Sequence, residues 1–182
     1  PLDSSAKTNA GSVYLYKFGK TGWHYSEVLK APKNTFSFGS SLSLRGNLLG
    51  VGAQNSTTMG EKSGAVFVFK KGFRKWRMDS RILAPDGASH DRFGTSIDLK
   101  QNLLLVGSSF GDDSGSSSGA AYLFEHDGKW QVRTKIVPQR NSSNNYFGSS
   151  VSISRNSYLI GLPGADVDQN SAVGGVCSAT LR

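Results

Sequence analysis

Cysteine is almost missing from this chain: among 182 residues Cys177 stands alone, so a disulfide within the chain is excluded. A lone thiolate also cannot supply the four ligands of a structural zinc site. No apolar run approaches the 18 or more residues of a membrane-spanning helix. Acidic side chains are few, at 13 against 21 Lys and Arg, and the formal charge of +8 favours acidic partners.

Glycine is abundant instead, with 22 residues, and one pattern recurs at a spacing of about 54 residues. A Phe-Gly pair stands at 38–39, 93–94 and 147–148, each time followed by a small polar residue and Ser. Self-similarity at such a spacing marks an array of units, none of which can bury its apolar face alone. The residues that carry the structural repeat are Phe38, Gly39, Phe93, Gly94, Phe147 and Gly148, with Trp23, Trp76 and Trp130 in the same phase.

One complete unit, residues 36–89, shows four expected strands. Residues 42–44 alternate apolar and polar side chains, which is typical of a strand with one buried face. Residues 48–52 are all apolar or Gly, which indicates a strand covered on both faces. After a polar loop, residues 66–69 (Val-Phe-Val-Phe) favour a third strand, and a fourth begins at Trp76.

Read in this way, residues 1–182 predict a single all-β array with thirteen strands. Its units are about 11–35 (partial), 36–89, 90–144 and 145–182 (partial). Repeated four-stranded antiparallel sheets favour a β-propeller, in which each blade packs its apolar faces on its neighbours. Because typical propellers need at least about 16 strands, we expect about three and a half blades of a larger ring, completed by further blades, another copy or a partner.

The motifs resemble FG-GAP repeats, which build the propeller of integrin α subunits and of integrin-α-like proteins in bacteria and other organisms. The resemblance covers residues 11–182. It rests on the Phe-Gly-x-Ser openings, on Val51-Gly52-Ala53 with its counterparts, and on Gly-Ala-Val-Phe-Val-Phe at 64–69. It implies a seven-bladed propeller, a role in cell adhesion through protein binding, and a place outside the cell or at its surface.

The resemblance also points to calcium as a candidate ligand, because integrin-type repeats often carry a calcium-binding loop resembling Asp-x-Asp-x-Asp-Gly after the Phe-Gly strand. Here the corresponding turns are 45–47, 100–102 and 155–157, and none contains a carboxylate. We therefore expect no cofactor and no metal in that position. The carboxylates left as metal candidates lie in the next loop: Asp112, Asp113, Asp166 and Asp168.

No catalytic set is apparent in the sequence, and we expect no enzyme. His24, His90 and His126 occupy different phases of the repeat, so the array does not bring them together. Residues 115–119 (Gly-Ser-Ser-Ser-Gly) read as a flexible loop. Cys177 aligns with apolar strand positions and is expected to pack in the core. The repeated Trp and Phe are expected to fill the space between blades, with ligand stacking as the alternative.

Candidate binding and modification residues lie outside the repeat signature. Variable polar loops at 53–63, 108–118 and 162–173 are where a rigid scaffold would bind a protein or glycan. Two Asn-x-Ser/Thr sequons predict N-glycosylation at Asn55 and Asn141. A basic hairpin around Trp76 reads either as a solvated sheet edge or as a site for a polyanion. Its six cations are Lys70, Lys71, Arg74, Lys75, Arg77 and Arg81.

Three functions are consistent with these features. The first is a non-catalytic, integrin-α-like propeller segment that presents its loops to a protein or glycan partner. The second is a structural or assembly module whose sheets pack into a larger complex. The third, which we place last, is part of a propeller hydrolase or lyase. For that enzyme the first strands offer Ser41, Ser43, Asp98, Ser152 and Ser154.

Overall fold

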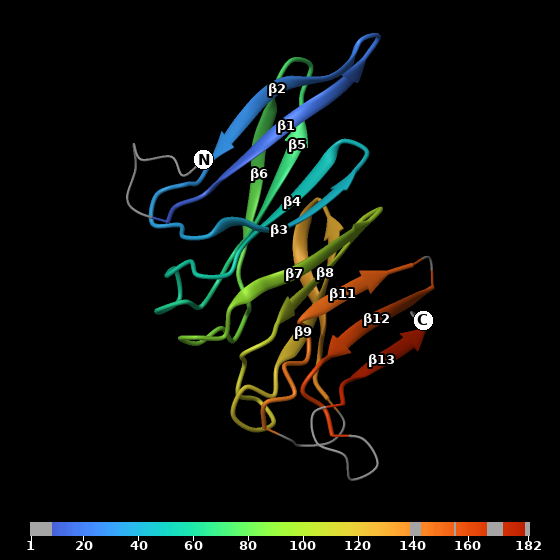
Figure 1. Ribbon diagram of the computed structural model, residues 1–182. Helices are drawn as coiled ribbons and strands as arrows, with labels where there is room; N and C mark the ends of the chain where they lie inside the picture. The colour runs from blue at the N-terminus through green and yellow to red at the C-terminus, as the bar shows by residue number, and fades with distance from the viewer. Residues whose placement is uncertain (1–8, 139–142, 155, 167–172, 181–182) are drawn as a thin grey trace.

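The computed structural model describes residues 9–138, 143–154, 156–166 and 173–180, and every regular element in them is a β-strand (Figure 1). The strands form antiparallel sheets of two, four, four and three strands, in chain order. None of the described residues belongs to a helix that could cross a membrane. The strands are β1 (Ser12–Gly19), β2 (Gly22–Lys30), β3 (Phe38–Arg45), β4 (Leu48–Ala53), β5 (Val66–Lys71), β6 (Trp76–Ile82), β7 (Phe93–Lys100), β8 (Leu103–Ser108), β9 (Ala120–Asp127), β10 (Lys129–Ile136), β11 (Ser150–Ile153), β12 (Ser157–Leu162) and β13 (Gly175–Thr180).

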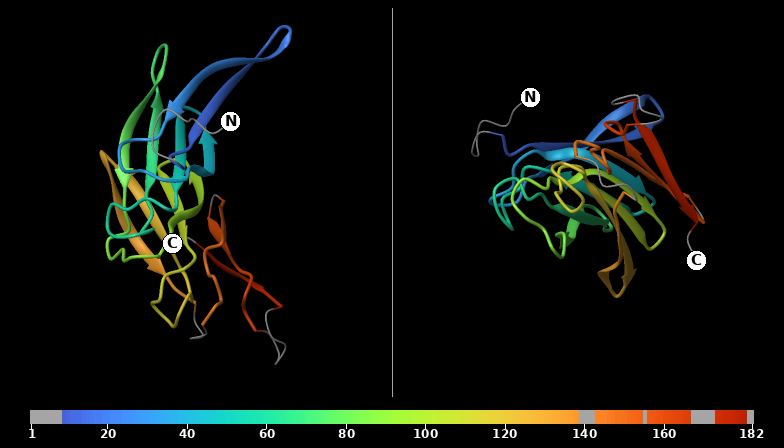
Figure 2. Two further views of the ribbon diagram at one scale, coloured as in Figure 1. Left: turned by 60° about the vertical axis from the view of Figure 1, so that its left-hand side comes forward. Right: turned by 90° about the horizontal axis from the view of Figure 1, so that it is seen from below.

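Consecutive strands pair within each sheet, as β3-β4-β5-β6 and β7-β8-β9-β10 show. Figure 2 shows the sheets following one another through the molecule, with the first and last at opposite ends. The all-β class and the four-stranded antiparallel sheets are therefore confirmed. Within the described residues the sheets do not close into a ring, so the number of blades, the total of seven and the division into units stay predictions.

The apolar core lies between successive sheets. Phe67 and Phe69 pack with the first sheet, whereas Val66 and Val68 pack with the third. Alternate residues of β5 therefore serve opposite neighbours, which is why this strand is apolar without interruption. The same holds for β4 and β8, in which every residue after the first is buried, as the sequence predicts.

The Phe-Gly pair marks the point where a sheet meets the preceding one. Phe93 is fully buried, and its ring centroid lies 5.5 Å from that of Tyr122 and 5.9 Å from that of Phe124. Gly94 has a φ of +89°, and a Cβ added there would lie 2.7 Å from the carbonyl oxygen of Ala65. Glycine alone meets both the backbone conformation and the close approach.

A second glycine closes the loop before the third strand. Gly64 and Gly119 have φ values of +86° and +80° and lie against the backbones of Phe93 and Phe147, respectively. Parallel bridges join the same pairs, Gly64 with Phe93 and Gly119 with Phe147. The loop of one unit is thereby bonded to the first strand of the next unit. The glycine of the Phe-Gly pair and the glycine that closes the loop therefore act at the same junction between sheets.

Polar side chains of the first strands connect three sheets. Asp98 on β7 accepts hydrogen bonds from Ser43 Oγ on β3 at 3.1 Å and from the backbone nitrogen of Ile153 on β11 at 2.9 Å. The backbone nitrogen of Leu99 donates to Ser43 Oγ at 3.0 Å, and the Arg45 guanidinium lies 3.8 Å from Asp98. Two residues considered for an enzymatic channel therefore hold neighbouring sheets together.

The aromatic repeat is buried only where a neighbouring sheet exists. Trp76 packs on the cluster between the first and second sheets, and Trp130 packs on the cluster between the second and third. Trp23 is 71% exposed, because within the described residues no sheet covers that face of β1 and β2. Trp76 and Trp130 thus lie between sheets as expected, and for Trp23 the same role stays a prediction.

Candidate functional site

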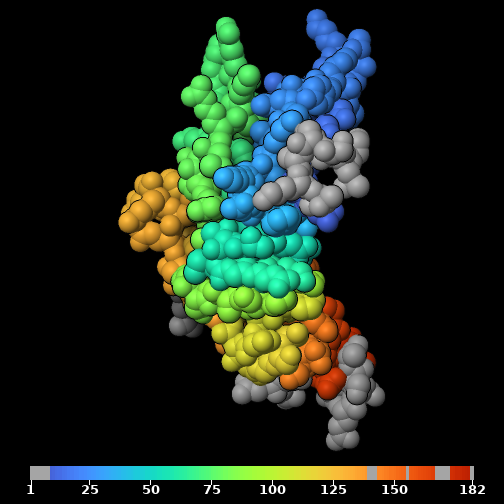
Figure 3. Space-filling view, turned by 90° about the vertical axis from the view of Figure 1, so that its left-hand side faces the viewer, coloured from blue at the N-terminus to red at the C-terminus, as the bar shows by residue number. Residues whose placement is uncertain are grey.

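The variable loops between second and third strands gather on one side of the stack. The loop at 54–63 joins β4 to β5, and the loop at 109–118 joins β8 to β9. Figure 3 shows them as successive bands of one surface, the first in teal and the second in yellow. The predicted third loop, 162–173, lies partly outside the described residues. We call the surface formed by 54–63 and 109–118 the loop face.

Each loop contains a buried serine that fixes its shape, Ser63 in the first loop and Ser118 in the second. Ser63 Oγ donates to the carbonyl oxygen of Ser56 at 3.3 Å and accepts from the backbone nitrogen of Met59 at 3.1 Å. Because these bonds satisfy backbone groups inside the loop, the loop keeps one conformation without secondary structure. The equivalent bonds of the second loop join Ser118 Oγ to Gly111 O at 3.3 Å and to Ser114 N at 3.0 Å.

Each loop also pairs with the segment that enters the next unit. The backbone nitrogen of Phe93 donates to the carbonyl oxygen of Ser63 at 3.0 Å, and that of Phe147 donates to Ser118 at 3.0 Å. The loops are therefore bonded to their own sheet and to the next one. Side chains that project from them are held on a fixed backbone.

The exposed side chains of the two loops differ although their anchors are the same. The first loop exposes Thr57, Thr58 and Met59, whereas the second exposes Asp112 and Ser116. Met59 is 46% exposed and offers an apolar contact on the first loop. A constant backbone frame with changing side chains suits recognition of a partner.

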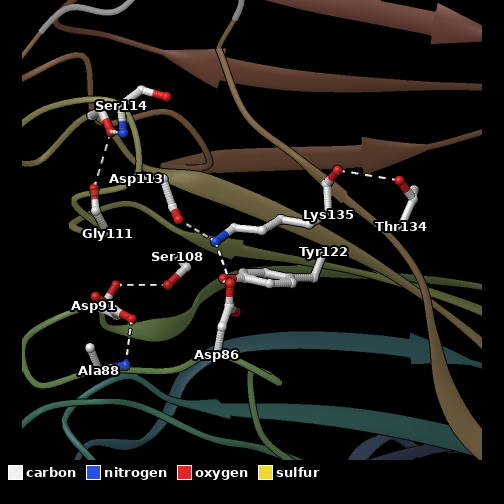
Figure 4. A network of polar contacts seen from close by, with 11 residues as sticks. Asp86, Ala88, Asp91, Ser108, Gly111, Asp113, Ser114, Tyr122, Thr134 and Lys135 are labelled. Atoms are coloured by element: carbon white, nitrogen blue, oxygen red, sulfur yellow. Dashed lines mark hydrogen bonds and ion pairs between the residues drawn. The ribbon is translucent and has the colours of Figure 1, made fainter.

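Lys135 on β10 reaches the second loop (Figure 4). Its ammonium donates to Asp86 Oδ2 at 2.6 Å and to Asp113 Oδ1. The Tyr122 hydroxyl donates to Asp86 Oδ1 at 2.9 Å, and the Tyr122 ring centroid lies 5.3 Å from the ammonium. One cation thus joins the turn before β7, the second loop and two strands of the sheet. No sequence signal pointed to this group, because Lys135 and Asp86 are separated by 49 residues.

The charges in this network depend on one another. Burial works to raise the pKa of Asp86, but the bonds from Lys135 and Tyr122 outweigh it and hold that pKa below its ordinary value. Burial works to lower the pKa of Lys135, whereas its bonds to Asp113 and Asp86 raise it overall. Burial raises the pKa of the neighbouring Asp91. A protonated Lys135 therefore offsets part of the negative charge of Asp86 and Asp113 at the base of the second loop.

We expect Lys135→Met to lower the free energy of unfolding by about 1 kcal/mol near neutral pH, because the partly exposed Asp86 and Asp113 lose their counter-charge. The folded-state pKa of Asp86 is depressed, so its contribution is present above the unfolded value of 3.8 and is lost as the pH falls. The effect of the substitution should therefore shrink in acid. Urea unfolding at about pH 7 and about pH 3 measures both.

Lys129→Met provides the matched control, since Lys129 is exposed at the start of the same strand. Its expected effect is within about 0.5 kcal/mol. Equal losses for the two variants, or a loss for Lys135→Met that does not change with pH, would contradict the role given to Lys135.

The carboxylates named as metal candidates are engaged or lie outside the described residues. Asp113 binds Lys135, and Asp112 Oδ1 accepts a hydrogen bond from the backbone nitrogen of Ser117 at 2.7 Å. Asp168 is not among the described residues, and Asp166 ends one described segment. Where the structure is described, no three His, Cys, Asp or Glu side chains are grouped to hold a metal ion. The expected absence of a cofactor stays a prediction.

The histidines and Cys177 occupy separate places. Cys177 is half-buried opposite Ile160 in the ladder between β12 and β13, at the position predicted from the repeat. It contributes to the cluster between the third and fourth sheets, which supports a packing role. Each histidine has a different neighbour: His24 contacts Thr21, His90 faces Glu61, and His126 packs on Trp130.

Of the two sequons, only Asn55 lies in the described residues, and Asn141 falls outside them. Asn55 Nδ2 donates to Ser37 Oγ at 2.8 Å. A glycan would replace one of its two amide hydrogens, and the other could keep this bond. Glycosylation at both sites stays a prediction.

The six cations of the basic hairpin come together on β5, β6 and the turn between them, and all six are exposed. In the described part of the chain none of them forms an ion pair with a carboxylate. The Arg74 guanidinium lies 6.0 Å from the ring centroid of Phe73, which is 99% exposed. Sequence reasoning missed Phe73. The sequence signal that could have identified Phe73 is an aromatic residue in a polar turn, between Gly72 and Arg74.

The sequence pattern of the FG-GAP repeat matches residues 76–124 and 130–176. Each matched segment begins in the fourth strand of one sheet and ends in the third strand of the next. It therefore contains the Phe-Gly junction at which neighbouring sheets meet. No curated protein matches the chain. Because the two matched segments together span more than half of its length, the chain belongs to the FG-GAP repeat family.

Proposed function

We propose that this FG-GAP repeat protein is a non-catalytic, integrin-α-like propeller module that binds a protein or glycan partner through its loop face. The observation that carries the proposal is the pair of loops with identical anchors and different surfaces. Ser63 and Ser118 make equivalent bonds, yet the side chains above them change from Thr57 and Met59 to Asp112 and Ser116. Conserving the frame while varying the surface is how binding loops work on a rigid scaffold.

A place outside the cell or at its surface belongs to the same proposal. FG-GAP repeats are typical of extracellular proteins, and a glycan on Asn55 would stand beside the first loop. A chain with one cysteine does not depend on disulfides, so the redox state of the compartment does not limit it. The hydrogen bonds of Asp98 and the bridges at the glycine junctions connect the sheets, and they provide the rigidity that disulfides provide in other proteins.

The binding role is tested with the double variant Thr57→Ser/Met59→Ser, which keeps the Asn-x-Ser/Thr sequon at Asn55 and leaves Ser56 and Ser63 in place. Wild type and variant are applied to a printed glycan array and to a panel of extracellular protein domains. A ligand of the loop face should lose at least about tenfold in affinity, because exposed anchor side chains carry most of the binding energy. Thermal unfolding should be unchanged, since both side chains are exposed.

Val132→Ser is the matched control, because Val132 is exposed on β10 away from both loops. Equal affinity of wild type and loop variant for every ligand found would remove the loop face from the proposal. A turnover activity of homogeneous protein that a single side-chain substitution abolishes would overturn the non-catalytic reading.

An assembly role is the second candidate, and it is favoured by the outer face of the first sheet. Tyr16 and Trp23 are exposed there by 56% and 71%, whereas their equivalents Phe69 and Trp76 pack on a neighbouring sheet. A further β-sheet of the same kind would cover this face. Sedimentation tests the idea: Trp23→Ser should shift an assembled species toward monomer, and a wild type that is monomeric at all concentrations would count against it.

A further inference from the structure

Two hairpins project from the same end of the molecule. Figure 1, the left view of Figure 2 and Figure 3 are related by turns about the vertical, and in all three the ends of the β1–β2 and β5–β6 hairpins stand highest. The β9–β10 hairpin, orange in Figure 3, stops well below them. A flat surface laid on this end would touch both hairpins together. We call residues 17–24 and 70–77 the two-pronged end.

An aromatic ring stands in the open at each prong. Phe73 is 99% exposed in the turn between β5 and β6. Its sheet is covered on both faces by neighbouring sheets, so this exposure is not that of an unfilled contact between sheets. On the other prong Phe18 and Trp23 are 72% and 71% exposed and contact one another edge to face at 5.3 Å.

The rings are surrounded by positive charge without compensation. Where the structure is described, none of the prong cations is paired with a carboxylate. The nearest carboxylates along the strands are engaged, since Glu27 accepts the backbone N–H of Trp76 and Asp79 accepts the Ser80 hydroxyl. The cations are Lys17 and Lys20 on one prong, and Lys70, Lys71, Arg74, Lys75 and Arg77 on the other.

The fold does not require this composition. The corresponding hairpin of the next sheet carries Glu125 and Asp127 at its end, and its Glu125 faces Arg133 at 3.7 Å. No aromatic residue stands in its turn, which is Asp127-Gly128-Lys129. A bare aromatic ring in the turn, with unpaired cations beside it, is therefore a property of the β5–β6 prong and not of the repeat, whereas Phe18 and Trp23 lie on the face of the first sheet that no described sheet covers.

We propose that the two-pronged end docks on an anionic lipid bilayer surface. The two tips stand at one end of the molecule and present their side chains toward a plane, whereas a single strand of nucleic acid is bound along a continuous positively charged groove. Aromatic rings partition into the boundary between headgroups and acyl chains, and the Lys and Arg beside them attract anionic headgroups. The Arg74 guanidinium, 6.0 Å from the Phe73 ring, places a cation at headgroup level when the ring enters the bilayer.

The test uses the full chain with vesicles of phosphatidylcholine alone and of phosphatidylcholine mixed with phosphatidylserine. Co-sedimentation should show binding to the mixed vesicles and little binding to the neutral ones. Phe73→Ser should weaken binding about tenfold, and Arg74→Glu/Lys75→Glu/Arg77→Glu should weaken it about 100-fold or more. All four side chains are exposed, so thermal unfolding should stay unchanged.

Two further variants separate insertion from general charge attraction. Lys33→Glu/Lys100→Glu/Lys129→Glu has the same net charge as the prong variant but leaves the prongs intact, and it should bind the mixed vesicles nearly as well as wild type. In a Trp23→Phe background, which removes the exposed native indole of the other prong, Phe73→Trp places a fluorophore at the tip. The emission that it adds should shift to shorter wavelength on mixed vesicles and be quenched by brominated lipid. Val132→Trp in the same background, on the hairpin strand that does not reach the plane, should show neither effect.

The proposal fails if mixed vesicles do not bind wild type. It also fails if Phe73→Ser binds as tightly as wild type, or if the emission of Phe73→Trp does not change, because the ring then stays out of the lipid. Retention on heparin or single-stranded DNA without vesicle binding would assign the same cations to a soluble polyanion instead. The loop face takes no part in this surface, so the outcome is independent of the binding function proposed for the loop face.

Discussion

Gly119→Ala is expected to lower the free energy of unfolding by about 4 kcal/mol, from left-handed backbone strain and a steric clash together. Gly119 has a φ of +80°. A Cβ there would lie 2.5 Å from the backbone nitrogen and 2.9 Å from the carbonyl carbon of Phe147, and closer still to its carbonyl oxygen. The clash involves backbone on both sides, so no side-chain movement relieves it. Denaturation by urea, followed by circular dichroism, measures the loss.

Gly128→Ala separates the two causes. Gly128 has a similar φ of +75°, but no atom lies within 4 Å of an added Cβ. The strain alone is expected to cost about 1 kcal/mol, which leaves about 3 kcal/mol for the clash. If both variants lose the same stability, the junction between loop and next sheet does not have the tightness that we assign to it.

Asp98→Ala is expected to lower the free energy of unfolding by about 3 kcal/mol, because three sheets meet at this carboxylate. The substitution leaves the N–H of the buried Ile153 and the hydroxyl of Ser43 without their acceptor. It also removes the charge that faces Arg45. Asp98→Asn should lose less, since its amide oxygen can serve one of the two donors but not both.

Asp79→Ala is the control for Asp98, because Asp79 is an exposed carboxylate on β6 that accepts a hydrogen bond from the hydroxyl of the adjacent Ser80. It should change stability by no more than about 0.5 kcal/mol. Hydrogen exchange at the amide of Ile153 adds a local reading: it should speed up in Asp98→Ala and stay slow in Asp79→Ala. Similar stabilities for the two Ala variants would show that Asp98 does not connect the sheets.

Much of the fold could be predicted because each local signal agreed with the others. The segment after Phe-Gly, the apolar run at 48–52 and the segment 66–69 all appear as strands in the expected order. The buried face expected from the alternation at 42–44 is wrong, because Leu42 and Leu44 are 53% and 54% exposed and Ser43 is buried, where it bonds to the next sheet. The exposure of Trp23 shows what such a local signal leaves out. Its spacing is that of Trp76 and Trp130, but burial depends on a neighbouring sheet, which the spacing of one residue type does not report.

The candidate site was less predictable for a physical reason. Lys135 and Asp86, or Asp98 and Ile153, are brought together by the stacking of sheets across about one repeat length. Nothing in either local segment identifies the partner, since a lone Lys or Asp on a strand is ordinarily a solvated surface residue. Asp98 was named only as one polar residue among several on the first strands, and its bonds decide that it is a structural link.

The sequence by itself determined the repeat, the all-β class and the positions of the strands, because glycine conformations and apolar alternation act within a few residues of the chain. Only the tertiary structure decided which side chains meet between sheets, which aromatic rings remain bare, and that two hairpins end on one plane. Those properties depend on how far each strand pair extends beyond its neighbours. Packing of whole sheets sets that distance, and no local pattern encodes it.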